Sequence, residues 1–199
     1  MRFQSIGTSV VKAIRQRDLL NTWLRLYHRN RSIPSLQEYE PSRLREEASD
    51  LVHYQVDATK TPPGFIIQSK GTRMSKAYGE AGMGRELEEY VGIRLAPVIM
   101  PAYRICFLHQ SPVYTVDELE DVGKRQIEYE RLLLPFGSSG RVSNILASLK
   151  TISIDGGFAI QDLMRRNGRL PRAKIRAVID CSAADQLPKR ILPDDLVFE

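Results

Sequence analysis

Three consecutive leucines, Leu132 to Leu134, lie within residues 127–136, a run that is typical of a β-strand. Successive side chains of a strand point to opposite faces of its sheet, so a strand with one buried face alternates apolar and polar residues. An unbroken apolar stretch predicts that both faces are buried at this point. The chain must therefore form a sheet that is covered on each side.

A period of two predicts the other strands. Residues 51–69 read as a hairpin with a turn at the two adjacent prolines, and strand-like runs follow at 112–120, 125–136 and 141–154. The letters GSSGR join the last two runs, and their glycines are typical of a hairpin turn. These patterns predict five antiparallel strands.

Residues 71–111 have a helical pattern that glycines and prolines interrupt, which predicts several short helices. Within them, YGEAGMGRELEE could be read as a phosphate-binding loop, but Gly79, Gly82 and Gly84 do not have the spacing of a dinucleotide fingerprint. Helix ends are the better interpretation of these glycines. The predicted fold class is α+β, with a five-stranded antiparallel sheet that carries short helices on one face.

An amphipathic helix is predicted at residues 8–28, with Thr8 or Ser9 as its N-cap. Its apolar face has to be buried, and the uncovered side of the leucine strand is the obvious place. The helix could come from the same chain or be exchanged from a partner. The residues that we expect at this interface are Ile14, Leu20, Trp23, Leu24 and Tyr27.

The chain has 199 residues, which is enough for one core domain with extensions. We expect an N-terminal helical extension at 1–48, the core at 49–155 and a C-terminal extension at 156–199. No apolar run approaches the roughly 20 residues of a membrane span, and the N-terminus does not resemble a secretory signal. Two distant cysteines do not suggest a disulfide framework. We expect a soluble, cytoplasmic protein with no membrane partner.

In this order of elements the sequence resembles a PAS domain, a small sensor module whose five-stranded sheet cups a ligand pocket beneath short helices. It is most similar to a family of small bacterial proteins in which a PAS core follows an amphipathic helix. The matching stretches are RDLLNTWLRLYHRNRSIPSLQEYEPSRL, SKGTRMSKAYGEAGMGRELEEYV, SPVYTVDEL and IEYERLLLPFGSSGRVSNILASL, and the resemblance covers residues 17–154.

The resemblance implies a non-catalytic signalling module that senses a small molecule or mediates dimerisation, and we expect a homodimer with a signalling partner protein. It implies no particular ligand or cofactor. Apolar walls with phenol hydroxyls are typical of a ligand pocket. A fully packed core without a ligand explains the same residues equally well. The predicted pocket residues are Tyr78, Leu87, Tyr90, Tyr103, Phe107, Tyr114, Tyr129 and Leu133.

Other chemistry has weaker support in the sequence. His28, His53 and His109 have no metal-ligand spacing, and His109 is kept only as a candidate haem ligand because some PAS domains bind haem. Cys106 reads as a small core residue. Arg131 breaks the alternation of its strand, so it either extends to the sheet edge or reaches an acidic ligand. No residues are predicted to be catalytic or to bind a metal.

The net charge of +5 permits a rival function, in which the chain binds nucleic acid or a second messenger. No recognition motif accompanies the basic residues, so nucleic acid is the less favoured partner. The residues of this alternative lie in the C-terminal extension: Arg165, Arg166, Arg169, Arg172, Lys174 and Arg176.

Overall fold

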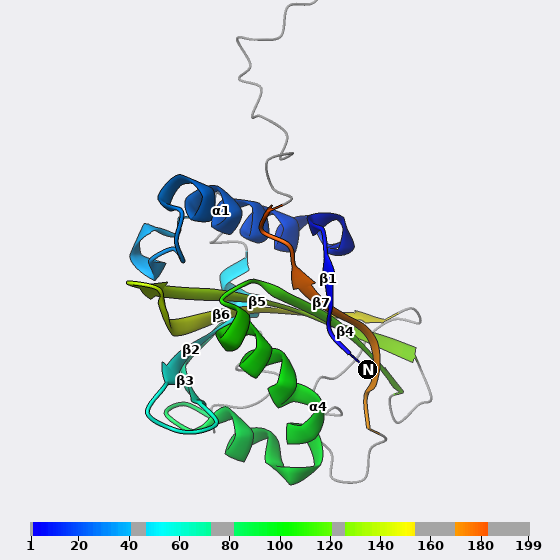
Figure 1. Cartoon of the computed structure of the whole chain (residues 1–199). Coiled ribbons are helices and arrows are strands. Elements are labelled where there is room, and N and C mark those ends of the chain that lie inside the picture. Colours follow the sequence, from blue (N-terminus) through cyan, green and yellow to red (C-terminus); the bar gives the residue numbers. More distant parts are fainter. Residues whose placement is uncertain (1, 41–46, 73–81, 121–125, 154–169, 183–199) are drawn as a thin grey trace, which may run out of the picture.

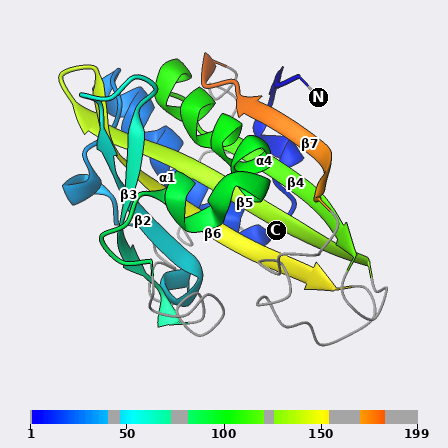
Figure 2. The ribbon, with the colours of Figure 1, turned by 90° about the horizontal axis from the view of Figure 1, so that it is seen from below.

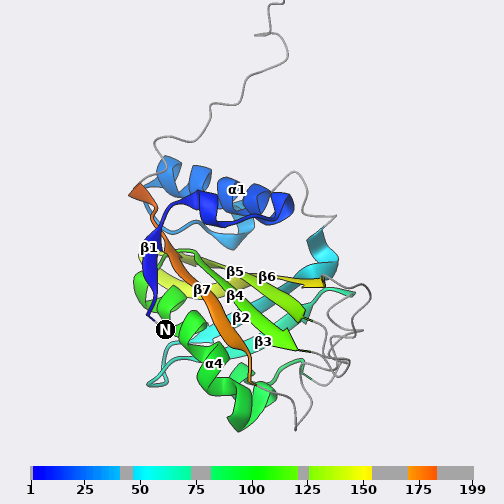
Figure 3. The same cartoon turned by 90° about the vertical axis from the view of Figure 1, so that its right-hand side faces the viewer.

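A single β-sheet lies between two helices in the computed structural model of this protein (Figure 1). The structure describes residues 2–40, 47–72, 82–120, 126–153 and 170–182. Helix α1 packs on one face of the sheet and helix α4 on the other, which gives three layers that are seen from the side in Figure 3. The predicted α+β class and the covered second face are therefore confirmed.

The sheet has seven strands in the order β1-β7-β4-β5-β6-β2-β3. Every neighbouring pair is antiparallel except β1 and β7, which are parallel. The strands are β1 (Gln4–Ile6), β2 (Leu51–Asp57), β3 (Gly64–Lys70), β4 (Val113–Glu120), β5 (Gln126–Ser138), β6 (Arg141–Ser153) and β7 (Arg172–Ile179).

The expected count of five strands is wrong, although β2 to β6 lie where the sequence predicted them. Residues 174–180, in the predicted C-terminal extension, have a strand-like sequence, and strand β7 contains most of them and pairs with β4 in the same sheet. Strand β1 was not predicted. It has three residues and pairs only with β7, so its formation depends on a partner 170 or more residues away rather than on a local pattern.

Helix α1 spans Ile14–Asn30 and begins later than the predicted residue 8. A 3₁₀ turn, η1 (Thr8–Val10), precedes it, and Val11 has an extended backbone. No side chain caps α1, so the expected capping by Thr8 or Ser9 is wrong. The chain uses these residues to cross from strand β1 at the sheet edge to the helix above the sheet (Figure 1).

Helix α4 spans Leu87–His109 and replaces the short helices that were predicted. Gly92 does interrupt it, with φ 75° and ψ 167°, and this produces a kink. Pro97 and Pro101 remain inside the helix, although each proline removes one backbone hydrogen bond. The helix crosses the strands on the face that Figure 2 shows, where its buried residues, including Met100 and Tyr103, join the core.

By length and composition alone α4 could also cross a membrane, a test that core helices of soluble proteins pass as well. One face of α4 packs against the chain's own sheet, and its buried residues are Leu87, Leu95, Ala96, Met100, Ala102, Tyr103 and Cys106.

The three leucines divide between two apolar cores. Leu133 belongs to the cluster between the sheet and α4, and Leu132 and Leu134 belong to the cluster between the sheet and α1. All three are buried, as predicted from their consecutive positions. The connections include two further 3₁₀ turns, η2 (Leu36–Glu38) and η3 (Ala48–Asp50). The sequence also predicts a short helix at 41–47, which Pro41 could begin, and another at 158–166, and these residues lie mostly or wholly outside the described ones.

Candidate functional site

The face of the sheet beneath α4 brings together most of the predicted pocket residues. Leu87 and Tyr103 come from α4, and Tyr129 and Leu133 from β5, and all four are buried in one cluster. Tyr90 and Phe107 are partly buried and pack against the same cluster. The residues converge because α4 lies across β4 and β5 with its apolar face inward.

Tyr114 does not lie with them. It is fully buried in the cluster beneath α1, on the opposite face of the sheet. Its neighbour Val113 faces α4, and side chains alternate along a strand, so Tyr114 has to face the other way. Tyr78 lies outside the described residues.

A buried polar group occupies the α4 face beside these aromatic residues. Nη1 of Arg131 donates to Oγ1 of Thr115 at 3.1 Å and lies 3.5 Å from Oδ2 of Asp117. Arg176 of β7 donates to the other carboxylate oxygen of Asp117. Each of these four residues has at most 7% of its surface exposed, so Arg131 does not extend to the sheet edge.

The pairing of β4 with β5 and β7 brings these four residues together. Thr115 of β4 is the direct partner both of Arg131 on β5 and of Arg176 on β7, so β4 lies between the two arginines. Asp117 lies two positions farther along β4, on the same face as Thr115. A single buried carboxylate thus contacts guanidinium groups from both flanking strands.

The phenol hydroxyls lie close to this polar group. Tyr103 donates to the hydroxyl oxygen of Tyr54 at 3.2 Å, and their rings meet edge to face. The guanidinium of Arg131 lies 5.1 Å from the ring centre of Tyr129, which is close enough for a cation–π contact. Arg131, which is not among the predicted pocket residues, therefore lies beside them.

Burial sets the protonation of these groups. It raises the pKa of Tyr103 to about 12, although the charge of Arg131 offsets part of that effect. Burial also raises the pKa of Tyr54 and of the Cys106 thiol well above their ordinary values. At neutral pH the phenols are therefore hydrogen-bond donors, and Cys106 is a neutral thiol rather than a nucleophile. The arrangement can bind an acceptor group, and its tyrosines are not suited to abstract protons.

The histidines lie apart from this face or at its margin. Nε2 of His53 lies 2.8 Å from Oδ1 of Asn144, and His28 and His109 lie in the last turns of α1 and α4. His109 is exposed to solvent. Among the described residues, no group of three or more His, Cys, Asp or Glu side chains could hold a metal ion.

The predicted interface of α1 faces the chain's own sheet. Leu20, Trp23 and Leu24 are fully buried there, and Nε1 of Trp23 donates to the carbonyl of Pro135 at 2.7 Å. Tyr27 stacks on Trp23 and is partly buried. Ile14 is 65% exposed and lies outside the contact.

Each described cation of the C-terminal extension contacts a carboxylate. Arg172 bonds to Glu118, Lys174 contacts Glu118 and Glu128, and Arg176 contacts buried Asp117. These ion pairs lower the local charge that an anionic polymer would meet. Arg165, Arg166 and Arg169 lie outside the described residues.

Comparison of the chain with protein-family models finds no match, and neither do comparisons with curated proteins and with solved structures.

Proposed function

We propose that this chain is a non-catalytic sensor or adaptor module of the PAS type, which binds a small ligand, a partner protein or both in bacterial signalling. The observation that carries the proposal is the buried set of donors between α4 and the sheet, formed by Tyr54, Tyr103 and Arg131. We further propose that it acts in the cytoplasm as a homodimer.

The order of elements supports the PAS assignment. Strands β2 and β3 precede the helical segment and β4 to β6 follow it, as the resemblance implies. These five strands are adjacent in the sheet and entirely antiparallel. Strands β1 and β7 extend the sheet beyond β4 and leave the face beneath α4 continuous.

The chemistry of this face favours a ligand with an apolar body and an acceptor oxygen. Neutral phenols and a guanidinium donate hydrogen bonds, and the surrounding side chains are aliphatic or aromatic. Such donors orient a bound molecule without reacting with it. This is the behaviour that a sensor requires, since its ligand has to bind and leave unchanged.

The proposal is tested by native mass spectrometry of the purified full-length chain, followed by denaturing extraction. We expect a small molecule to copurify, and we expect its removal to lower the melting temperature. Tyr103→Phe should weaken its retention, because the ring stays and only the hydroxyl is lost. Tyr39→Phe is the matched control, since this hydroxyl is buried on the other face and donates to the carbonyl of Leu19 at 2.9 Å.

A chain that carries no small molecule, with the same melting temperature before and after extraction, would have a fully packed core instead. Equal retention in the Tyr103 and Tyr39 variants would place the ligand elsewhere.

A further inference from the structure

Helix α4 exposes an apolar face that the fold does not use. Only 33% of its most apolar 18-residue stretch is buried. Ile93 is 94% exposed and Leu108 is 67% exposed, while Pro97 is also exposed between them. Pro97 follows Ile93 by about one helical turn and Leu108 follows Pro97 by about three, so the three residues lie along one side of the helix.

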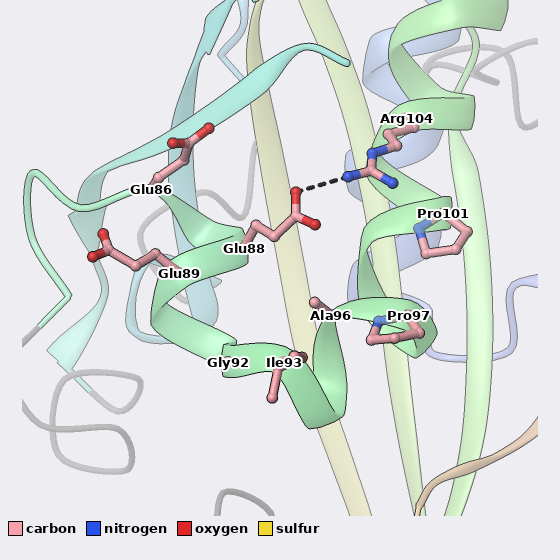
Figure 4. A pocket seen from close by; sticks show the side chains of 9 residues that line it. All are labelled: Glu86, Glu88, Glu89, Gly92, Ile93, Ala96, Pro97, Pro101 and Arg104. Carbon is pink, nitrogen blue, oxygen red and sulfur yellow. Dashed lines mark hydrogen bonds and ion pairs between the residues drawn. The ribbon is translucent and has the colours of Figure 1, made fainter. Parts of the chain in front are cut away.

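The kink at Gly92 turns this face into a groove of about 860 Å³ between the first turn of α4 and the rest of the helix (Figure 4). The apolar residues that line it are Ile93, Ala96, Pro97 and Pro101. In Figure 4 the side chains of Glu86, Glu88 and Glu89 lie on the side of the first turn, and Arg104 lies on the second segment of the helix. Arg104 reaches across from the second segment to Glu88 of the first at 2.7 Å.

The groove is acidic although the whole chain has a net charge of +5. Glu86, Glu88 and Glu89 line it, against the single cation Arg104. Each carboxylate contacts a cation of this chain, but these pairs are partly exposed, and such pairs contribute little to stability. An incoming cation can therefore replace them at small cost.

The stability of the fold explains only some of the residues that line the groove. Carboxylates in the first turn of a helix are favoured by its dipole, which explains Glu88 and Glu89. Nothing in the described part of the chain covers Ile93, which adjoins exposed Pro97 in the lining of the groove, and a contiguous exposed apolar patch is typical of a surface that binds another protein.

We propose that the α4 groove docks a basic amphipathic helix of a partner protein, with apolar side chains on Ile93, Pro97 and Pro101 and lysines or arginines against Glu86, Glu88 and Glu89. Charge complementarity selects this occupant over an acidic segment, and the regular apolar stripe suits a helix laid in a groove. The inference rests on the proposed adaptor role and specifies where and by what chemistry the partner binds.

The probe is a fluorescently labelled synthetic amphipathic helix with leucines on one face and lysines along its flanks, titrated with the full-length protein and followed by anisotropy. Ile93→Asp should weaken its binding by roughly tenfold or more, because it places a charge among the apolar residues that line the groove. Ile14→Asp is the matched control: it also replaces an exposed isoleucine, but on α1 at the opposite face of the sheet.

Glu89→Lys, at a side chain that is 68% exposed, should also weaken binding, and added salt should reduce the effect. The inference is overturned if a matched peptide with glutamates in place of lysines binds equally well, or if Ile93→Asp and Ile14→Asp behave alike. It is also overturned if Ile93→Asp abolishes only self-association in sedimentation, because the occupant is then a second copy. If the groove binds no peptide while a small ligand is still found beneath α4, the docking inference fails and the proposed sensor role stands.

Discussion

Arg131 and Asp117 form an ion pair inside the sheet, with 3.5 Å between Nη1 and Oδ2 and at most 3% of either residue exposed. A second guanidinium, from Arg176, contacts the same carboxylate. The free-energy cost of removing the two guanidinium groups from water is therefore offset chiefly by the buried carboxylate of Asp117. Removing that anion leaves buried charge without its counter-charge, which is far more destabilising than losing a surface pair.

Asp117→Asn should accordingly lower the free energy of unfolding by about 3–5 kcal/mol. The measurement is urea denaturation. Glu118→Gln is the control, because the adjacent carboxylate on β4 pairs with Arg172 and Lys174 at the surface, and little change is expected there. Similar losses of unfolding free energy in both variants would show that Asp117 does not stabilise the two buried arginines.

Trp23 should be the side chain on which the packing of α1 depends most. It is fully buried, and its indole donates to the carbonyl of Pro135, which lies on β5 beyond the last residue that pairs with β4, Leu133. Trp23→Ala should cost about 3–5 kcal/mol. Trp23→Phe should cost less, since most of the ring volume remains.

Thermal unfolding and sedimentation velocity together test this prediction. A lower melting temperature with an unchanged sedimentation profile is the outcome expected if Trp23 acts only within its own chain. Loss of a dimer at an unchanged melting temperature would instead assign it to a subunit interface.

Local patterns predicted the parts of the fold that local physics determines. The consecutive leucines required cover on both faces, and α1 and α4 supply it. Strand β1 carries no such signal, because its three residues pair with β7 only after the chain has folded. Pro97 and Pro101 suggested helix ends, but burial of Met100 and Tyr103 stabilises the helix across both prolines.

The candidate site was predictable in part. Period-two alternation already placed Arg131 on the same face as Tyr129 and Leu133, and this signal could have assigned it to the pocket. Its contact with Asp117 spans 14 residues, and the contact of Arg176 with Asp117 spans 59, so neither pair follows from sequence spacing. The groove depends on the angle that Gly92 imposes on α4, which no local pattern specifies.

Gly137 should not tolerate a side chain. It lies at a β-bulge in the turn from β5 to β6, and an added Cβ would lie 1.8 Å from the carbonyl oxygen of Arg141. Gly137→Ala should lower the free energy of unfolding by roughly 1–3 kcal/mol or more, because backbone has to move. Gly7→Ala is the control, with φ −67° and nothing within 4 Å of the new Cβ. Chemical denaturation of both variants distinguishes a steric effect from a general loss of glycine flexibility.

Glu130 should make the stability of the protein depend on pH. Glu128 and Glu130 are two positions apart on one strand, which predicts that both face solvent, but only 2% of Glu130 is exposed. Burial raises the pKa of its carboxyl group; the hydroxyl of Tyr114 and the charges of Lys12 and Lys150 oppose that rise, while Glu128 adds to it. The folded state therefore holds the proton more tightly than the unfolded state does.

Between the ordinary pKa of a glutamate and the raised pKa of Glu130, folding takes up a proton, so the free energy of unfolding falls as pH rises through this interval. Glu130→Gln removes the titrating group and should abolish that part of the slope. The variant should gain stability relative to the native chain as pH rises, and the gain should vanish in acid. Urea denaturation at a series of pH values, followed by the fluorescence of the single tryptophan Trp23, measures both curves. Glu128→Gln, which removes a carboxylate paired with Lys174, should retain most of the slope, because burial contributes more than Glu128 to the raised pKa of Glu130. Parallel curves for Glu130→Gln and the native chain would contradict the assignment.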